Sequence, residues 1–196
     1  MTNLAERNPA IKQLIARWDS PDGHPYKGQL IDWEAYEANP ENIGCMCAQG
    51  QALHLVGGMP VKDLRSLPQS EADKQTASLL GISRAHAILL RSVNDSIDGA
   101  PAIVLTHPEK VLGDQAHIVL AFWRHLDRMT AKQWAAARAA AWVAAGAAAG
   151  DAAGAACAEI QGAALMRENG KTFYFLPMFG FADPEAVFAA DLELAA

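Results

Sequence analysis

A four-residue spacing between Trp134 and Gly162 is the feature that most constrains how this chain folds. Almost every residue between the marked positions is alanine, which has the highest intrinsic helix propensity. The marked positions carry large side chains first and glycines later: Trp134, Arg138, Trp142, Gly146, Gly150 and Gly154. This part of the chain therefore predicts one long, thin helix that can pack closely against a neighbour.

The predicted long helix has recognisable signals at both ends. Thr130 and Gln133 form a capping box at its start, and Asn169-Gly170 is typical of a helix C-terminus. The roughly 38 residues between these signals would extend about 57 Å as one helix. A break near Gly150-Asp151 would give a helical hairpin instead, and the sequence leaves both forms open.

Three glycines interrupt the second half of this span, at positions 146, 150 and 154. Each costs about 1 kcal/mol relative to alanine inside a helix, and their spacing would let another helix approach closely. A four-residue step advances 400°, so five steps turn the marked positions by roughly 200° and leave no single flat face. The pattern predicts close packing at Gly146, Gly150 and Gly154 and a homo-oligomer. The alternative is low-complexity drift in a GC-rich genome.

The rest of the 196-residue chain also carries helical patterns, so we expect an all-α fold in a compact multi-helix domain. Apolar spacing and turn residues indicate short helices over residues 8–18, 31–36, 44–56, 61–67, 70–80, 83–93, 108–112, 114–126 and 183–192. Leu55 is expected to face inward in the third of these helices. Ser70 and Asp73 approximate a capping box at the start of the fifth.

The C-terminal part contains the only strand-like run, Thr172–Leu176, which predicts at most one short extended segment. We divide the chain into a helical N-terminal region over residues 1–129, the Ala-rich helix over residues 130–170 and a C-terminal segment over residues 171–196. These three parts are expected to form one structural domain.

The charge of the chain is modestly acidic, at −6 with a pI near 5.4. A protein held to DNA or RNA by phosphate contacts needs a basic face, so a nucleic-acid partner is not expected. No apolar run reaches the roughly 18–20 residues of a membrane span, and the N-terminus shows no signal-peptide pattern. Three cysteines do not make a disulfide framework, so the cytoplasm is the expected location.

The segment Gly44–Gly50, with the sequence GCMCAQG, has the most unusual local chemistry. Small residues at a helix start expose backbone N–H groups, which favour an anion or a phosphate. The candidate ligand-binding residues are Gly44, Cys45, Cys47, Gln49 and His54. The spacing C-x-C-x6-H is not a standard zinc spacing, so we expect no metal. The alternative is that the cysteines act as small core residues.

Residues 74–93 have the outline of a helix-turn-helix motif, because Ala77 and Gly81 lie four residues apart and Ser83 opens a second helix. The candidate DNA-binding residues of this alternative are Ser83, Arg84, His86 and Arg91. The apolar run Ile88-Leu89-Leu90 and the acidic charge favour two helices packed as an ordinary hairpin instead.

The six histidines form no recognisable catalytic set. A nucleophile elbow, a Walker-type loop and a dinucleotide fingerprint are all missing from the sequence. We therefore assign no catalytic residue and expect no cofactor, and an enzyme is unsupported. The five tryptophans are expected to anchor the core, with an aromatic clamp for a flat ligand as the alternative.

The tract Ala135–Trp142, with its continuation through Gly-Asp-Ala-Ala-Gly, resembles Ala-rich tracts in uncharacterised phage-borne proteins and in proposed bacterial immunity proteins. The resemblance is one of composition, covers roughly 30 of the 196 residues and carries over no functional residue. It implies a small accessory protein of a mobile element. We expect a non-enzymatic binding protein that sequesters a protein partner or a small anionic ligand, in an immunity or counter-defence setting. A DNA-binding regulator and a structural component of a particle are the alternatives.

Overall fold

The computed structural model describes residues 9–20, 23–96, 101–147, 173 and 175–194, with the side chains described up to residue 140 in the long Ala-rich span. Over these residues the chain is built from helices, which confirms the predicted all-α fold class. The chain divides into two compact units, residues 1–111 and 112–196. None of the described helices is both long and apolar enough to cross a membrane.

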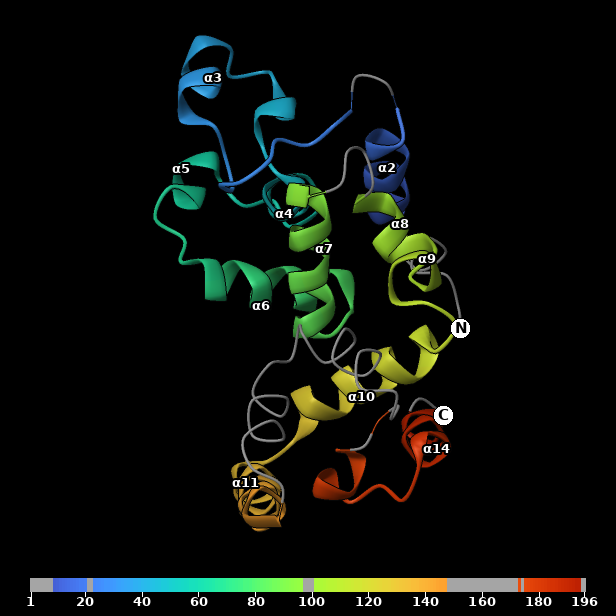
Figure 1. Cartoon of the computed structure of the whole chain (residues 1–196). Coiled ribbons are helices and arrows are strands. Elements are labelled where there is room, and N and C mark those ends of the chain that lie inside the picture. Colours follow the sequence, from blue (N-terminus) through green and yellow to red (C-terminus); the bar gives the residue numbers. More distant parts are fainter. Residues whose placement is uncertain (1–8, 21–22, 97–100, 148–172, 174, 195–196) are drawn as a thin grey trace. The chain divides into compact units, whose positions relative to one another are not determined.

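The first unit is an assembly of short helices around one central helix, α7 (Figure 1). α7 lies against its sequence neighbours α6 and α8 and against α4, which is distant in the sequence. The elements are α2 (Pro9–Trp18), α3 (Trp33–Ala38), the 3-10 helix η1 (Ile43–Cys45), α4 (Ala48–Gln51), the π-helix η2 (Ala52–Val56), α5 (Val61–Leu64), α6 (Gln69–Leu80), α7 (Arg84–Ser96), α8 (Pro101–Thr106) and α9 (Glu109–Leu112), which ends at the unit boundary.

Helix α2 carries the predicted apolar face. Ile11, Leu14, Ile15 and Trp18 are all buried, and the helix packs against η2 and α8. Trp18 is fully buried, and its Nε1 donates a hydrogen bond to Oε1 of Gln51 at 3.1 Å. Because this buried N–H has a partner, the tryptophan can anchor the core without an unsatisfied polar group.

The single helix expected over residues 44–56 is wrong, because the segment forms η1, α4 and the π-helix η2 in succession. Met46 and Cys47 have extended backbones, which separate η1 from α4. A π turn takes one more residue than an α turn, so the side chains that follow it are rotated by about 100°. The prediction that Leu55 faces inward is also wrong: Leu53 is buried, and Leu55 is 40% exposed.

The hairpin of α6 and α7 has the predicted turn but a different start. Gly81 ends α6 in the left-handed region, with φ of 66°, and Oγ of Ser83 accepts a hydrogen bond from the His86 N–H at 3.1 Å, capping α7. The capping box of Ser70 with Asp73 is wrong, because α6 begins at Gln69 and the Asp73 side chain is buried. Helix α8 was not predicted at all.

The second unit contains α10 (Ala116–Arg128), α11 (Ala131–Ala147), the 3-10 helix η3 (Leu176–Phe179) and α14 (Pro184–Glu193). α14 packs on α10 and η3 packs on α11 (Figure 1). The capping box is confirmed at the start of α11, where the Gln133 N–H donates to Thr130 Oγ1 and the Thr130 N–H donates to Gln133 Oε1. Asp183 caps α14, where its Oδ1 accepts a hydrogen bond from the Ala186 N–H, as expected for the start of the last helix.

The strand-like run and the second half of the Ala-rich span are the remaining predictions for the C-terminal part of the chain. The strand-like run is wrong where it is described, because Phe175 lies in a turn and η3 begins at Leu176. Phe173 has a positive φ of 61°, which an extended strand does not contain. The part of the Ala-rich span beyond Ala147, including Gly150, Gly154 and the stop at 169–170, lies outside the described residues.

Candidate functional site

The segment Gly44–Gly50 lies in the core of the first unit. Residues 45–50 are buried, and Ile31 and Met46 form an antiparallel bridge. Around the bridge the Asp32 N–H donates to the Cys45 carbonyl at 2.8 Å, and the Cys47 N–H donates to the Leu30 carbonyl at 3.1 Å. This pairing holds the candidate segment against residues 30–32.

Backbone donors at the start of α4 are bonded to acceptors of the chain itself. The Gly50 N–H donates to Sγ of Cys47 at 3.4 Å, and the Ala48 N–H donates to Oδ1 of Asn94 in α7 at 3.3 Å. Burial raises the pKa of the Cys47 thiol to about 11 and also raises the pKa of Cys45. Both thiols are therefore neutral at physiological pH, as expected of core cysteines.

Two glutamines of the same segment are fully buried and hold it in place. Gln51 accepts from Trp18, and its Nε2 donates to the Met46 carbonyl at 3.1 Å and to the Ile43 carbonyl at 3.3 Å. Gln49 points in another direction, where its Nε2 donates to Oδ1 of Asp73 at 2.9 Å and to the Ala87 carbonyl at 3.1 Å. The amide groups thus connect α4 to neighbouring elements.

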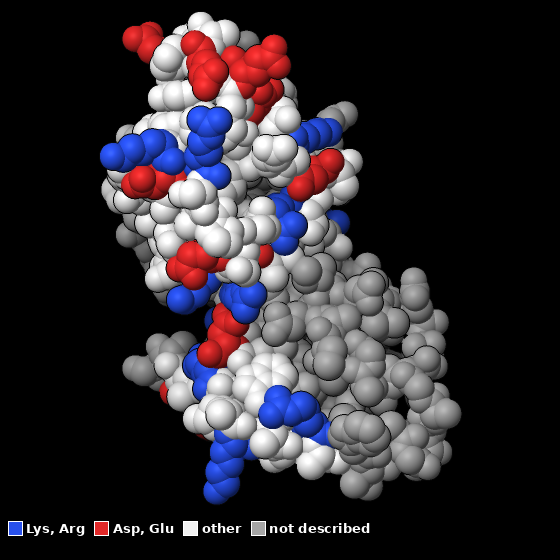
Figure 2. Space-filling model, turned by 90° about the vertical axis from the view of Figure 1, so that its left-hand side faces the viewer, with Lys and Arg blue, Asp and Glu red and all other residues white. Residues whose placement is uncertain are grey.

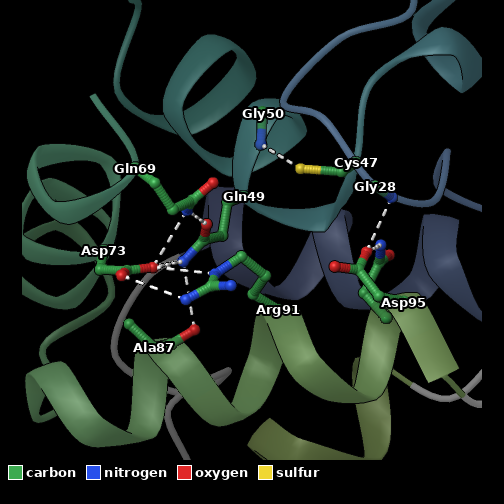
Figure 3. A network of polar contacts seen from close by, with 10 residues as sticks. Gly28, Cys47, Gln49, Gly50, Gln69, Asp73, Ala87, Arg91 and Asp95 are labelled. Atoms are coloured by element: carbon green, nitrogen blue, oxygen red, sulfur yellow. Dashed lines mark hydrogen bonds and ion pairs between the residues drawn. The ribbon is translucent and has the colours of Figure 1, made fainter. Parts of the chain in front are cut away.

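Asp73 is the centre of a buried polar network between α4, α6 and α7 (Figure 3). Besides Gln49, it accepts from Nε2 of Gln69 at 3.2 Å and from Nε and Nη2 of Arg91 at 3.3 and 3.4 Å. Gln69 also donates to Oε1 of Gln49 at 2.9 Å. The carboxylate is therefore surrounded by donors, which offsets the cost of burying its charge.

The network leaves little unused hydrogen-bonding capacity inside the first unit. Among the described residues, Oγ1 of Thr76 is the one buried side-chain N or O atom without a hydrogen-bond partner. Since the groups around Asp73 bond to one another, the arrangement fixes three helices in one geometry. The network therefore connects α4, α6 and α7.

The remaining sequence candidates lie apart from one another. His54 is half-buried on η2, with its Nδ1 at 2.8 Å from the Met59 carbonyl oxygen. Of the four DNA-binding candidates, Ser83 and His86 are buried, Arg91 bonds to Asp73, and Arg84 is exposed. No group of three or more His, Cys, Asp or Glu side chains in the described parts of the chain could hold a metal ion.

The second unit contains an ion-pair cluster that the sequence reasoning missed. Asp191 of α14 is nearly buried and accepts hydrogen bonds from Arg124, at 2.6 to 3.0 Å, and from Arg128, at 2.9 Å. Burial alone would raise the pKa of Asp191, but the hydrogen bonds and charges of the two arginines hold it below its ordinary value. The sequence does carry one indication of this cluster: Arg124 and Arg128 are spaced i, i+4 on α10, which places both on one face of the helix.

An aromatic cluster packs beside this ion pair. Phe122 lies near His125, Phe175 and Phe179, with ring centroids 5.1 to 6.5 Å apart. His125 also meets Phe181 edge to face at 4.7 Å. Burial lowers the pKa of His125 below 6.5, and the charge of Arg128 lowers it further.

Lowering the pH from about 7.5 to about 5.5 is expected to destabilise the second unit through His125. The unfolded chain binds a proton at the ordinary pKa of 6.5, whereas folded His125 binds one only at lower pH. Stability is therefore greatest above pH 6.5 and falls as the pH drops toward the folded pKa. Urea unfolding at both pH values, with His125→Gln, should show a smaller pH dependence for the variant. His117→Gln, an exposed histidine of the same helix, is the control, and equal loss in all three proteins would contradict the prediction.

The outer face of α14 is the least protected apolar surface of the described residues. Leu192 is 54% exposed and Leu194 66% exposed, and the third exposed large hydrophobic side chain is Leu55 in the first unit. Helix α14 thus turns the carboxylate of Asp191 inward and a leucine outward. No protein-family model, curated protein or solved structure matches this chain. The functional interpretation of this surface therefore depends on the burial and contacts of the chain's own residues.

Proposed function

We propose that this protein works by binding a partner protein through the outer face of α14. The observation that carries the proposal is that this helix buries Asp191 and leaves Leu192 exposed. Burying a leucine side chain is worth about 1.5–3 kcal/mol, so a partner that covers Leu192 gains free energy that the free protein lacks. Contiguous exposed apolar patches are typical of protein contact sites, and Leu192 and Leu194 are both exposed at the end of this helix.

Hydrogen bonds inside the first unit favour a protein partner over a small anionic ligand as the molecule that this chain binds. An anion at the start of α4 would compete with Cys47 and Asn94, which already accept the N–H groups there. A DNA-binding role would use α7, whose side chains mostly face the core of its unit. Both remain alternative proposals with less support than the α14 surface.

The biological setting is a separate part of the proposal. The Ala-rich tract suggests a phage or mobile-element protein that sequesters its partner in immunity or counter-defence. The genes beside its own test this setting directly, because capsid genes would favour a particle component and defence genes would favour sequestration.

The partner proposal is tested by capture from a lysate of the source organism with three immobilised proteins. These are the native chain, a Leu192→Ser/Leu194→Ser variant and a Leu55→Ser control, which changes the exposed leucine of the other unit. We expect one protein to be retained by the native chain and the control and lost by the α14 variant. That protein, purified, should then bind the native chain in calorimetry. Identical capture by all three would refute the α14 surface.

A further inference from the structure

We propose that a second copy of this chain docks on the outer face of α14 through its own α11. The inference rests on the proposed binding role of α14 and names the chemistry that this face recognises: a cationic helix face lined by small side chains. Each of the two helices lies in the second unit, and each exposes a face that complements the other in charge and size.

The exposed face of α14 is acidic around an apolar centre. Glu185, Ala189 and Glu193 follow one another at i, i+4 and i+8, and Leu192 lies beside them on the same side. All four side chains are exposed. Helix α14 contains no lysine or arginine, so a partner meets two carboxylates and one leucine with no cation among them.

The exposed face of α11 has the opposite charge. Ala131, Ala135 and Ala139 are exposed at i, i+4 and i+8, and Lys132 and Arg138 flank them. Helix α11 contains no aspartate or glutamate. Figure 2 shows lysine and arginine side chains, drawn in blue, on the lower part of this view of the molecule.

The charges at these two faces are unused within the described part of the chain. None of Lys132, Arg138, Glu185 and Glu193 has a hydrogen bond or ion pair from its side chain there. An exposed side chain with no partner in its own chain can pair across an interface without first breaking an internal contact.

The charges on the two faces are spaced so that they can pair. Glu185 and Glu193 are about 12 Å apart along the axis of α14, and Lys132 and Arg138 are about 9 Å apart along α11. Lysine and arginine side chains span the difference of about 3 Å, so both carboxylates reach a cation. Leu192 then lies over alanines, which leave room for it.

A two-fold axis would place α14 of each copy on α11 of the other, so every contact occurs twice. Closed two-fold contacts bury both faces and end the assembly at a dimer. Because the contact includes four ion pairs at its edges, we expect it to weaken as the salt concentration rises.

Charge reversal tests the proposal on the full chain by analytical ultracentrifugation. We expect the native chain to form dimers, and Glu185→Lys/Glu193→Lys or Lys132→Glu/Arg138→Glu to raise the dimer dissociation constant at least about tenfold, because like charges then face each other. Combining all four changes restores opposite charges and should return the constant to within about threefold of the native value. Glu34→Lys/Glu37→Lys, which reverses two exposed charges on α3, is the matched control and should dimerise as the native chain does.

A native chain that is monomeric at all concentrations would overturn this proposal. So would a dimer that persists in both reversed variants, or one that the combined variant does not restore. The proposed function is judged separately, by whether Leu192→Ser/Leu194→Ser loses a captured partner. A monomeric chain that still captures a partner through α14 refutes the second-copy proposal and supports the function.

Discussion

Replacing Gly50 with alanine is expected to lower the free energy of unfolding of the first unit by about 3 kcal/mol. A Cβ at this position would lie 2.2 Å from the carbonyl oxygen of Leu30, which is backbone and cannot rotate away. That oxygen also accepts the Cys47 N–H at 3.1 Å, so moving it weakens the pairing around Met46. Alanine would otherwise favour a helix by about 1 kcal/mol, which makes a loss of stability a clear sign of the close contact.

The control for this prediction is Gly44→Ala in the same segment. A Cβ at Gly44 meets Oδ1 of Asn42 at 3.0 Å, and this side chain can shift. We therefore expect a change within about 1 kcal/mol. Urea unfolding followed by near-UV circular dichroism, which reports the packing of buried Trp18 against Gln51, measures both variants. Equal stability of the Gly50→Ala variant and the native chain would contradict the assigned close contact.

Local signals in the sequence correctly predicted three of the helix ends. The capping box of Thr130 and Gln133, the cap at Asp183 and the left-handed Gly81 each depend on residues within three or four positions of one another. Such interactions are visible in a sequence because they need no knowledge of the tertiary fold. The apolar face of α2 was equally clear, since one periodicity defines it.

Tertiary contacts decided the features that the sequence did not predict. Asp73 has the spacing of a capping residue, but its carboxylate is held by Gln49 and by Arg91, which lie 24 and 18 residues away. Leu55 follows the apolar spacing of an α-helix, but the π turn changes its direction. Neither effect has a local pattern, so a helical interpretation of each segment was the natural but incorrect one.

The small residues of Gly44–Gly50 led us to predict a ligand site, and the structure shows a packing reason for that composition. Gly50 permits the approach of Leu30, and Gln49 bonds to groups of α6 and α7. A close backbone contact and a ligand-binding helix start both favour small residues, so composition alone cannot separate them. The Asp191 cluster joins residues 63 and 67 positions apart, and only the fold brings them together.

Replacing Asp73 with alanine is expected to lower the free energy of unfolding of the first unit by about 2–3 kcal/mol. The change leaves the buried amide of Gln49 without one acceptor and the guanidinium of Arg91 without its counter-ion. Removal of one partner from a fully buried ion pair costs about 3–5 kcal/mol. The Arg91 side chain is 27% exposed, so water replaces part of the lost interaction and the expected loss is smaller.

A double-mutant cycle separates the network from a general effect of losing a charge. Because Asp73 and Arg91 share two hydrogen bonds, Asp73→Ala combined with Arg91→Met should cost at least about 1 kcal/mol less than the sum of the two single changes. Asp63→Ala removes an exposed carboxylate from α5 and should change stability by less than about 0.5 kcal/mol. Additive single changes, or an Asp73→Ala variant as stable as Asp63→Ala, would show that this carboxylate does not hold α4, α6 and α7 together. A measured coupling would show that the helices of the first unit are joined by polar groups at their centre as well as by apolar packing.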